Sequence, residues 1–453
     1  MIARWLSEIA AAVDGRLLGE DVWVSSVVVD SRAASVGSLF VALPGDRVDG
    51  HDFVDEARAR GAVAALVARP MDGPPCVQVR DTGEALLALA RDERRRRPDA
   101  MVVGITGANG KTSTKDLAAA VIGTRWRTHA SPASFNTEIG LPVTLLGAAP
   151  DAEVIVAEMG ARRLGDVALL CEIAQPSVVV VTNVGVAHME IFGSWEAIVE
   201  ASAEPVLELA EDDVAILNAD DPVVRGYAER TAARVRWFGL GSEADVRAES
   251  IVLAGDGRAS FVLAVDGERE PTELGVPGEH MVPNALAAAA CGAALGLSAA
   301  ECAAALKGAR ISASRMETFT TPEGALVVND AYNANPESMA AGLKAARWMA
   351  GDGRLVAVLG HMAELGPISL EEHERLGELI VRIGVDRLIT VGELARMIHR
   401  ASVREGQEPQ DAVDYDDIDD ALEDLHGWLH PGDVVLIKGS RVVGLERLAG
   451  ALR

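Results

Sequence analysis

A glycine-rich segment from Gly104 to Thr112 carries the residues best suited to chemistry, in the order Gly-Ile-Thr-Gly-Ala-Asn-Gly-Lys-Thr. The apolar run Met101–Thr106 predicts a buried strand, and Lys111 and Thr112 open a predicted helix. Backbone N–H groups of a glycine-rich turn and of a helix N-terminus bind phosphate. Lys111 would reach the β- and γ-phosphates of a nucleotide, and the Thr112 hydroxyl would bind Mg²⁺. The other residues of this predicted nucleotide loop are Gly107, Ala108, Asn109, Gly110 and Ser113.

The spacing of this loop is a variant, because the usual phosphate-loop pattern has glycine at the position of Ile105. The alternative interpretation is an ordinary glycine-rich turn between a strand and a helix. We favour the phosphate loop because the strand, the Gly-Lys-Thr sequence and the helix follow one another in the required order.

Two further apolar runs lead to side chains that can bind a metal ion. Glu153–Ala157 is followed by Glu158, and Ser177–Thr182 leads within a few residues to His188. If both runs are strands parallel to Met101–Thr106, their carboxyl ends meet at one edge of a sheet, where ligands bind in open α/β folds. Glu158 and His188 would then hold Mg²⁺ against a transferred phosphoryl group. An isolated histidine is more often structural and imidazole is a poor Mg²⁺ ligand, so His188 is the weaker assignment.

The chain length and the alternation of apolar runs with helical segments predict an α/β protein of three domains, which must position these residues. The first (1–98) is a small α/β domain, the second (99–311) a central ATP-binding domain with a parallel sheet and the phosphate loop, and the third (312–453) a Rossmann-like, doubly wound domain. The predicted strands are 22–29, 38–43, 62–67 and 76–79; then 101–106, 153–157, 177–182 and 214–217, with a hairpin of 250–253 and 260–265; and finally 326–329, 355–359, 387–391 and 434–437. A helix over 285–297 should close the central domain, and the acidic stretch 411–424 is expected to be a solvated loop and helix face.

The charge balance excludes nucleic acid and anionic membranes as partners. Acidic residues number 68 against 42 basic ones, so the net charge of −26 repels phosphate backbones and anionic lipids. The basic run Arg94–Arg97 lacks interleaved aromatic residues and is expected to be a solvated linker. Four widely spaced cysteines suit a reducing compartment, and no apolar stretch is long enough to span a bilayer. We therefore expect a cytoplasmic protein, without membrane insertion, that is a monomer.

Several further motifs resemble those of the Mur ligases, which join an amino acid or a dipeptide to a carboxylate on a UDP-linked sugar. The phosphate loop with its variant spacing is one of these motifs. The others follow in one register along essentially the whole chain: Asp30–Arg32, Asp49–Phe53, Phe135–Pro142, Asp330–Met339, Val358–Gly360 followed by Glu364–Gly366, and Lys438–Arg441. Together they are closest to the family member that adds the dipeptide D-alanyl-D-alanine to a UDP-linked muramoyl tripeptide.

The resemblance implies an ATP- and Mg²⁺-dependent ligase. In the family, ATP phosphorylates the substrate carboxylate to an acyl phosphate, which the incoming amine then attacks. Lys111 and Mg²⁺ would neutralise the charge on the transferred phosphoryl group. Arg315 and Asp330 would reach the nucleotide from the third domain, with Asp330 at its ribose, and Asn284 would contact the adenine.

The resemblance also implies which residues bind the substrates. Asn136 and Glu138 would lie near the nucleotide or the metal ion and belong to the substrate-binding set. The residues implied for the UDP end are Ser31, Arg32, Asp49 and His51, and those implied near the dipeptide are Tyr332, Asn333 and Asn335.

Some of these residues also fit structural roles. Asn335 followed by Pro336 is a good helix start. Asp30 and Asp49 could be turn residues, and His51 could brace a loop. The sequence leaves these alternatives open.

Three positions depart from the family pattern. Most Mur ligases place a carbamylated lysine, which binds a second Mg²⁺, ahead of an Asn-Ala-Asp-Asp motif; here that motif, Asn218–Asp221, is intact but the lysine position is Ser202. The usual asparagine after His280 is Met281, and the glycine before the Arg-Met-Glu motif is Ser314. Three hypotheses therefore stay open: the peptidoglycan ligase, a paralogous ligase of a secondary pathway with another carboxylate or amine, and a nucleotide-binding protein without ligase activity.

Overall fold

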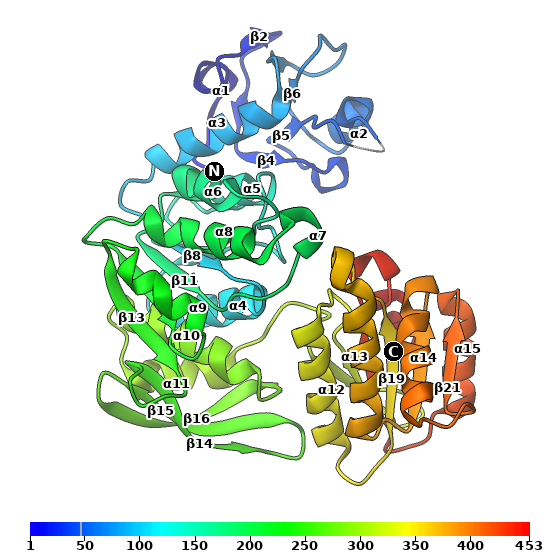
Figure 1. The fold of residues 1–453 in the computed structure, drawn as a ribbon. Coiled ribbons are helices and arrows are strands. Elements are labelled where there is room, and N and C mark those ends of the chain that lie inside the picture. The colour runs from blue at the N-terminus through cyan, green and yellow to red at the C-terminus, as the bar shows by residue number, and fades with distance from the viewer. Residues whose placement is uncertain (46–47) are drawn as a thin grey trace.

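The chain folds into three lobes, each built around its own sheet (Figure 1). The computed structural model describes residues 1–45 and 48–453. In Figure 1 the first lobe and the C-terminal lobe lie on different sides of the central lobe. The α/β class and the three-domain architecture are as predicted, whereas the boundaries at 98 and 311 stay predictions.

The first lobe has a five-stranded sheet in the order β2-β7-β6-β5-β4 and a separate antiparallel pair, β1 and β3. The strands of the larger sheet are parallel except β2, which runs antiparallel to β7 at one edge. The bounds are β1 Arg4–Trp5, β2 Arg16–Leu18, β3 Trp23–Val24, β4 Ser26–Val28, β5 Ser38–Val41, β6 Ala64–Val67 and β7 Cys76–Gln78, with helices α1 Leu6–Ala12, α2 Val54–Ala59 and α3 Thr82–Arg95.

The central lobe has a nine-stranded sheet in the order β16-β15-β14-β13-β12-β11-β8-β10-β9. In this order, all strands from β14 to β9, including β8, are parallel to one another. The strands β15 and β16 extend the sheet as antiparallel strands. The strands are β8 Met101–Thr106, β9 Thr128–Ala130, β10 Val154–Glu158, β11 Val178–Val181, β12 Val214–Asn218, β13 Arg234–Gly239, β14 Val246–Leu253, β15 Arg258–Val265 and β16 Glu268–Pro277. The helices are α4 Lys111–Ile122, α5 Gly140–Gly147, α6 Asp166–Ala174, α7 Met189–Phe192, α8 Trp195–Leu207, α9 Pro222–Arg225, α10 Met281–Ala294 and α11 Ala299–Gly308.

The C-terminal lobe has a six-stranded sheet in the order β17-β18-β22-β19-β20-β21 with helices on both faces, as Figure 1 shows. Only the edge strand β17 is antiparallel. The strands are β17 Glu317–Thr320, β18 Leu326–Asn329, β19 Leu355–Gly360, β20 Arg387–Val391, β21 Ala412–Tyr415 and β22 Val434–Lys438, and the helices are α12 Pro336–Ala350, α13 Ser369–Ile383, α14 Arg396–Glu405, α15 Ile418–Trp428 and α16 Glu446–Ala451. No helix in the described part of the chain is long and apolar enough to cross a membrane.

Strand β8 is fixed at the centre of the parallel sheet by its apolar side chains. It lies between β11 and β10, parallel to both, so that Val181 pairs with Thr106 and Glu158 with Ile105 at the ends of the strands. The alanine-rich helix α10 packs against α4, which follows the glycine-rich loop. Small side chains allow the two helices to approach closely, and this packing sets the direction of α4 beneath the loop.

The prediction for the acidic stretch 411–424 was partly wrong, because it contains the edge strand β21. The carboxylate of Asp414 on this strand pairs with Arg396 at 2.8 Å. Paired charges on an edge strand have no apolar alternation for sequence analysis to detect. The strands β13 and β16 were missed for a similar reason, since arginine or glutamate residues interrupt their apolar pattern.

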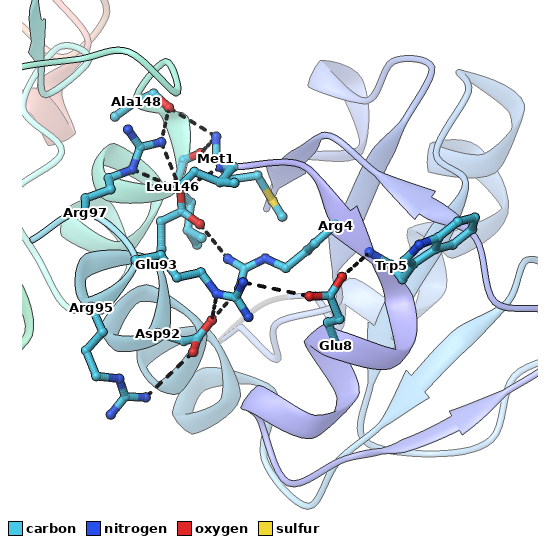
Figure 2. Close-up of polar contacts among 12 residues, drawn as sticks. Met1, Arg4, Trp5, Glu8, Asp92, Glu93, Arg95, Arg97, Leu146 and Ala148 are labelled. Atoms are coloured by element: carbon cyan, nitrogen blue, oxygen red, sulfur yellow. Dashed lines mark hydrogen bonds and ion pairs between the residues drawn. The ribbon is translucent and has the colours of Figure 1, made fainter.

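The run Arg94–Arg97 was predicted to be a solvated linker, but it lies at the end of helix α3, and only Arg95 and Arg96 are exposed. Arg97 is buried, pairs with Glu93 at 2.9 Å and donates to the carbonyl oxygen of Ala148 at 2.8 Å (Figure 2). Arg4 pairs with the same buried Glu93 from the other side. Arg97 therefore anchors the first lobe to the central lobe.

Helix α3 completes this anchor with two apolar faces. Leu86 and Leu89 lie in the core of the first lobe, whereas Leu87 and Ala90 pack in a core of the central lobe. A helix that is buried on two sides between two sheets leaves little room for the first and central lobes to move separately.

Candidate active site

The glycine-rich loop takes a conformation that requires glycine at two places. Gly107 and Gly110 have φ angles of +131° and +80°. A Cβ atom on Gly107 would lie 2.1 Å from the Thr182 hydroxyl oxygen, and one on Gly110 would lie 2.3 Å from the Asn284 side-chain oxygen. Thr182 and Asn284 therefore pack closely against the loop, whose backbone N–H groups lie around the start of α4.

Lys111 folds back over the loop. Its Nζ donates to the carbonyl oxygens of Gly107 at 2.6 Å and Ala108 at 3.2 Å. Burial lowers the pKa of Lys111, while the nearby Glu158 carboxylate opposes that shift. Lys111 is thus a preplaced cation within the loop, in the position expected for a group that meets phosphate.

Asn109, at the tip of the loop, is held by residues that the sequence analysis did not single out. Its backbone N–H donates to the Asn183 side-chain oxygen at 2.8 Å, and its carbonyl accepts from the Asn183 amide at 3.1 Å and the Thr182 hydroxyl at 2.7 Å. The signal was available, because Thr182 and Asn183 directly follow β11 at the edge where the loop lies.

Glu158 lies at the carboxyl end of β10, beside the loop, as predicted. Its side chain is buried and accepts from the Thr112 hydroxyl at 2.8 Å and from the Asn136 amide at 2.7 Å. The Thr112 hydroxyl is also 2.9 Å from that of Ser134. These side chains form a compact oxygen-rich cluster at the start of α4. Glu138, which was predicted to share this region, is exposed.

The loop that carries Ser134 and Asn136 is fixed by a buried lysine that the sequence analysis missed. The Nζ of Lys115 donates to the carbonyl oxygens of Ser131 at 2.8 Å and Ala133 at 2.9 Å. Ala133 has a left-handed φ of +45°, so this loop has a strained shape that the lysine stabilises.

His188 lies beyond β11 and meets the C-terminal lobe. Its Nδ1 pairs with the carboxylate of Glu364, and the Glu190 N–H donates to the Glu364 carbonyl at 3.1 Å. Both His188 and Glu364 have left-handed φ angles, +59° and +62°. Burial and then the charge of Lys111 lower the pKa of His188, and Glu364 opposes them. The imidazole is therefore close to the phosphate loop and has Nε2 as its remaining ring nitrogen.

Two further side chains of the C-terminal lobe contact the central lobe here, one at the loop that carries Ser134 and one at the phosphate loop. The Arg315 guanidinium donates to the Ser134 hydroxyl oxygen at 3.0 Å. The Asn335 amide donates to the Asn109 side-chain oxygen at 2.6 Å, while the Asn335 oxygen accepts from the N–H of Ser338 at 2.9 Å. Asn335 is thus the N-cap of α12, as the helix-start interpretation of Asn335 and Pro336 predicted, and it also contacts the phosphate loop.

The other predicted residues of the C-terminal lobe, Asp330, Tyr332 and Asn333, contact residues of their own lobe. Asp330 accepts from the Nζ of Lys438 at 2.6 Å, and the same Nζ donates to the Asn333 carbonyl oxygen at 3.0 Å. The ring of Tyr332 lies under the Arg315 guanidinium, 4.2 Å from its carbon. Asn284, on α10, is buried against Gly110 and accepts from the Thr114 hydroxyl at 3.4 Å. Its predicted contact with adenine stays a prediction.

The four residues predicted for the UDP end form a separate group in the first lobe. Asp49 caps a short 3₁₀ turn and pairs with Nδ1 of His51 at 2.6 Å, and Nε2 of His51 accepts from the Ala68 N–H at 2.9 Å. Both ring nitrogens of His51 are engaged, so the structure shows the bracing role for this residue.

Ser31 and Arg32 occupy a second capped turn of the first lobe. The Ser31 hydroxyl donates to Glu56 at 2.9 Å. Asp30 accepts from the backbone N–H and side chain of Arg32, and these contacts lower the pKa of Asp30 to about 2. The exposed Arg32 guanidinium is the group of this set that is best placed to meet an anion.

Two of the three positions that depart from the family pattern, Ser202 and Ser314, have distinctive local surroundings. Ser202 lies half-buried on α8 beside the phenol of Tyr227, which donates to the Val199 carbonyl oxygen at 2.7 Å. Burial raises the pKa of Tyr227, and the Ser202 contact lowers it. Ser314 has a left-handed φ of +57°, and such a conformation favours glycine.

Comparison with known proteins agrees with this arrangement. Family models match the chain as the Mur ligase catalytic domain over residues 24–92, the Mur ligase middle domain over 105–292 and the Mur ligase glutamate ligase domain over 314–441. A protein of Mycobacterium leprae named UDP-N-acetylmuramoyl-tripeptide–D-alanyl-D-alanine ligase is 41% identical, over 94% of this chain and 92% of its own. The chain belongs to the Mur ligase family.

Solved structures give the same result for the fold. A crystal structure of MurF from Acinetobacter baumannii superposes with a TM-score of 0.86 at 29% identity, over 98% of both chains. The MurF ligase of Thermotoga maritima, solved in complex with ADP, superposes with a TM-score of 0.80 at 30% identity, over 95% of this chain and 97% of that one. The three lobes are thus those of a Mur ligase, in the order that the resemblance implied.

Proposed function

We propose that this protein is an ATP-dependent ligase that joins D-alanyl-D-alanine to UDP-N-acetylmuramoyl-tripeptide in peptidoglycan synthesis. The observation that carries the proposal is that three side chains of the C-terminal lobe, Arg315, Asn335 and Glu364, contact the central lobe at or beside the phosphate loop. The curated relatives with this name, 41% identical in Mycobacterium leprae and 34% identical in Bacillus subtilis, support the choice of substrates.

The reaction has two steps that the site residues can support. The γ-phosphoryl group of ATP passes to an oxygen of the tripeptide carboxylate, and ADP is left. The dipeptide amine then attacks the acyl carbon, loses a proton, and phosphate leaves as the amide forms. The loop N–H groups and Lys111 hold the phosphoryl oxygens, and Arg315 approaches the same region from the C-terminal lobe, so negative charge developing there meets fixed cations.

The chemistry of Thr112 and Glu158 fits Mg²⁺. Glu158 is a buried carboxylate whose hydrogen-bond partners are a hydroxyl and an amide rather than a cation, and oxygen atoms are the ligands that Mg²⁺ prefers. Within residues 1–45 and 48–453 no three His, Cys, Asp or Glu side chains form a metal cluster. Mg²⁺ bound to one carboxylate, one hydroxyl and substrate phosphates would neutralise phosphoryl charge, and Thr112 and Glu158 would hold it.

We assign His188 to bind the metal ion or the phosphoryl group through its Nε2 atom. Glu364, which pairs with Nδ1, would orient the ring. Asp330 and Asn284 would bind the ribose and the adenine. Ser31, Arg32, Asp49 and His51 would shape the site of the UDP end in the first lobe, and Asn136, Glu138, Tyr332 and Asn333 would line the substrates. We also propose that the protein acts in the cytoplasm, because both ATP and UDP-linked precursors are used there, and that it acts as a monomer.

A phosphate-release assay tests the function. ATP, Mg²⁺ and UDP-muramoyl-tripeptide should give phosphate only when D-alanyl-D-alanine is added, with one amide formed per ADP. Release with a different amine and not with this dipeptide would favour a paralogous ligase, which the Ser202 departure keeps as the second candidate. Tight nucleotide binding without release under any pairing of acceptor and amine would identify a binding protein.

A further inference from the structure

Two arginine side chains lie against one tyrosine ring at the edge of the C-terminal sheet. The guanidinium carbon of Arg315 is 4.2 Å from the centre of the Tyr332 ring, and that of Arg441 is 5.1 Å from it. Tyr332 follows the carboxyl end of β18 and Arg441 follows that of β22, while Arg315 precedes the antiparallel β17. These three chain segments therefore meet at the edge of the sheet that faces the phosphate loop.

The two arginines differ in what surrounds them. Arg315 donates to Ser134, next to Thr112 of the phosphate loop, and its Nε is buried without a hydrogen-bond partner. Arg441 is exposed and pairs with no carboxylate among the described residues, whereas its neighbours in sequence, Lys438 and Arg447, pair with Asp330 and Asp419.

Neither Arg315 nor Arg441 forms an ion pair among the described residues, although both lie against the same ring. Two like charges on one aromatic ring repel each other unless anions approach them. An unsatisfied buried donor on Arg315 and an unpaired guanidinium on Arg441 therefore indicate two anion positions around Tyr332. The position at Arg315 adjoins Ser134 and Thr112, so it belongs to the phosphoryl group.

We propose that Arg441 binds the terminal carboxylate of D-alanyl-D-alanine and, with Tyr332 as a spacer from Arg315, selects a dipeptide as the amine substrate. This assignment rests on the proposed function. The amine of the dipeptide must reach the acyl phosphate near Arg315, and its carboxylate lies about 7 Å further along an extended chain. A single amino acid would be about one residue too short to bind Arg441 from the same position.

The UDP-linked peptide also carries carboxylates, but it fits this position less well. Its UDP end is assigned to the first lobe, which lies on a different side of the central lobe from the C-terminal lobe in Figure 1. Arg441 and Tyr332 both belong to the C-terminal lobe, and the exposed Val442 offers an apolar contact for an alanine methyl group. The small amine substrate is therefore the ligand that we assign to Arg441.

Initial rates with D-alanyl-D-alanine and with its C-terminal amide, on wild type and Arg441→Ala, test the assignment. Wild type should use the amide roughly 10- to 100-fold less efficiently, because one charge-assisted bidentate contact is lost. Arg441→Ala should lower kcat/KM for the free acid by a similar factor, through KM for the dipeptide, and should no longer distinguish acid from amide. Its KM values for ATP and for UDP-muramoyl-tripeptide should stay unchanged.

Two further variants complete the experiment. Arg447→Ala, an exposed arginine of the same lobe, should behave as wild type with all substrates. Arg441→Lys keeps the charge without the planar fork and should retain part of the discrimination, which also covers the case that the alanine variant folds poorly. The assignment is overturned if wild type uses acid and amide equally, if Arg441→Ala still prefers the acid, or if KM rises for the UDP-linked substrate instead. Absence of phosphate release by wild type with the dipeptide would count against the proposed function.

Discussion

Lys111 is the residue whose removal should separate catalysis from folding most clearly. Its Nζ contacts only loop carbonyl oxygens in this structure, so the sheet and α4 do not depend on it. Lys111→Ala should lower phosphate release by about 10²- to 10³-fold or more, because a preplaced cation at the transferred phosphoryl group is lost. The melting temperature should change little, and turnover at the wild-type rate would remove Lys111 from the site.

Ser202 occupies the position at which the family resemblance implies a carbamylated lysine. Serine has no amine to carbamylate, so turnover should be indifferent to added bicarbonate, and saturation should require more Mg²⁺ than in a lysine-bearing relative. Bicarbonate stimulation of the wild-type enzyme would contradict this.

Ser202→Lys should recreate the missing ligand if the space beside Tyr227 holds a lysine stem. Activity at low Mg²⁺ should then rise, and rise further with bicarbonate. Ser202→Met is a control of similar length without the amine, and it should show neither effect. A loss of melting temperature shared by both variants would show that Tyr227 fills the space.

At the scale of elements, the contact of α3 with α5 depends on one buried carboxylate. Glu93 pairs with Arg4 of the first lobe and Arg97, which in turn holds the carbonyl oxygens of Ala148 and Ala149 at the end of α5 (Figure 2). Glu93→Gln leaves the buried Arg97 guanidinium without its carboxylate partner and leaves Arg4 with Asp92 alone. We expect the free energy of unfolding, measured in urea, to fall by about 3–5 kcal/mol.

Glu172→Gln is the matched control for this change. Glu172 also pairs with an arginine, Arg91, but it is exposed, so its loss should cost less than about 1 kcal/mol. Equal effects of the two substitutions would show that the ion pairs of α3 do not stabilise the junction of the lobes.

The whole molecule has one rigid junction and one that we expect to move. The first and central lobes share α3, whereas the central and C-terminal lobes meet mainly through side chains, among them His188–Glu364 and Asn335–Asn109. Because these contacts surround the phosphate loop, the C-terminal lobe should close when nucleotide and acceptor bind.

Small-angle scattering should therefore give a smaller radius of gyration with an ATP analogue and UDP-muramoyl-tripeptide than without them. Glu364→Ala should reduce this change and lower kcat, while Glu374→Ala, at a half-buried glutamate on α13 that pairs with Arg404, should do neither. Identical profiles of the wild-type enzyme with and without ligands would exclude closure.

The sequence by itself determined the parallel sheet, the phosphate loop and the edge at which Glu158 lies. These features depend on local patterns, since continuous apolar runs define buried strands and a glycine-rich turn before a helix binds phosphate wherever it occurs. The start of α12 was also predictable, because Asn335 and Pro336 satisfy the first turn of a helix without help from the rest of the chain.

Only the tertiary structure decided which distant groups meet. Asn335 uses one atom of its side chain for the helix and the other for Asn109, 226 residues away, and no local pattern encodes the second contact. Glu364 pairs with His188 of another lobe, and Arg97 is buried at the end of α5, because Glu93 and the carbonyl oxygens of Ala148 and Ala149 lie within its reach. Charge in a sequence predicts solvent exposure, but burial depends on whether folding brings an opposite charge or a carbonyl oxygen within reach.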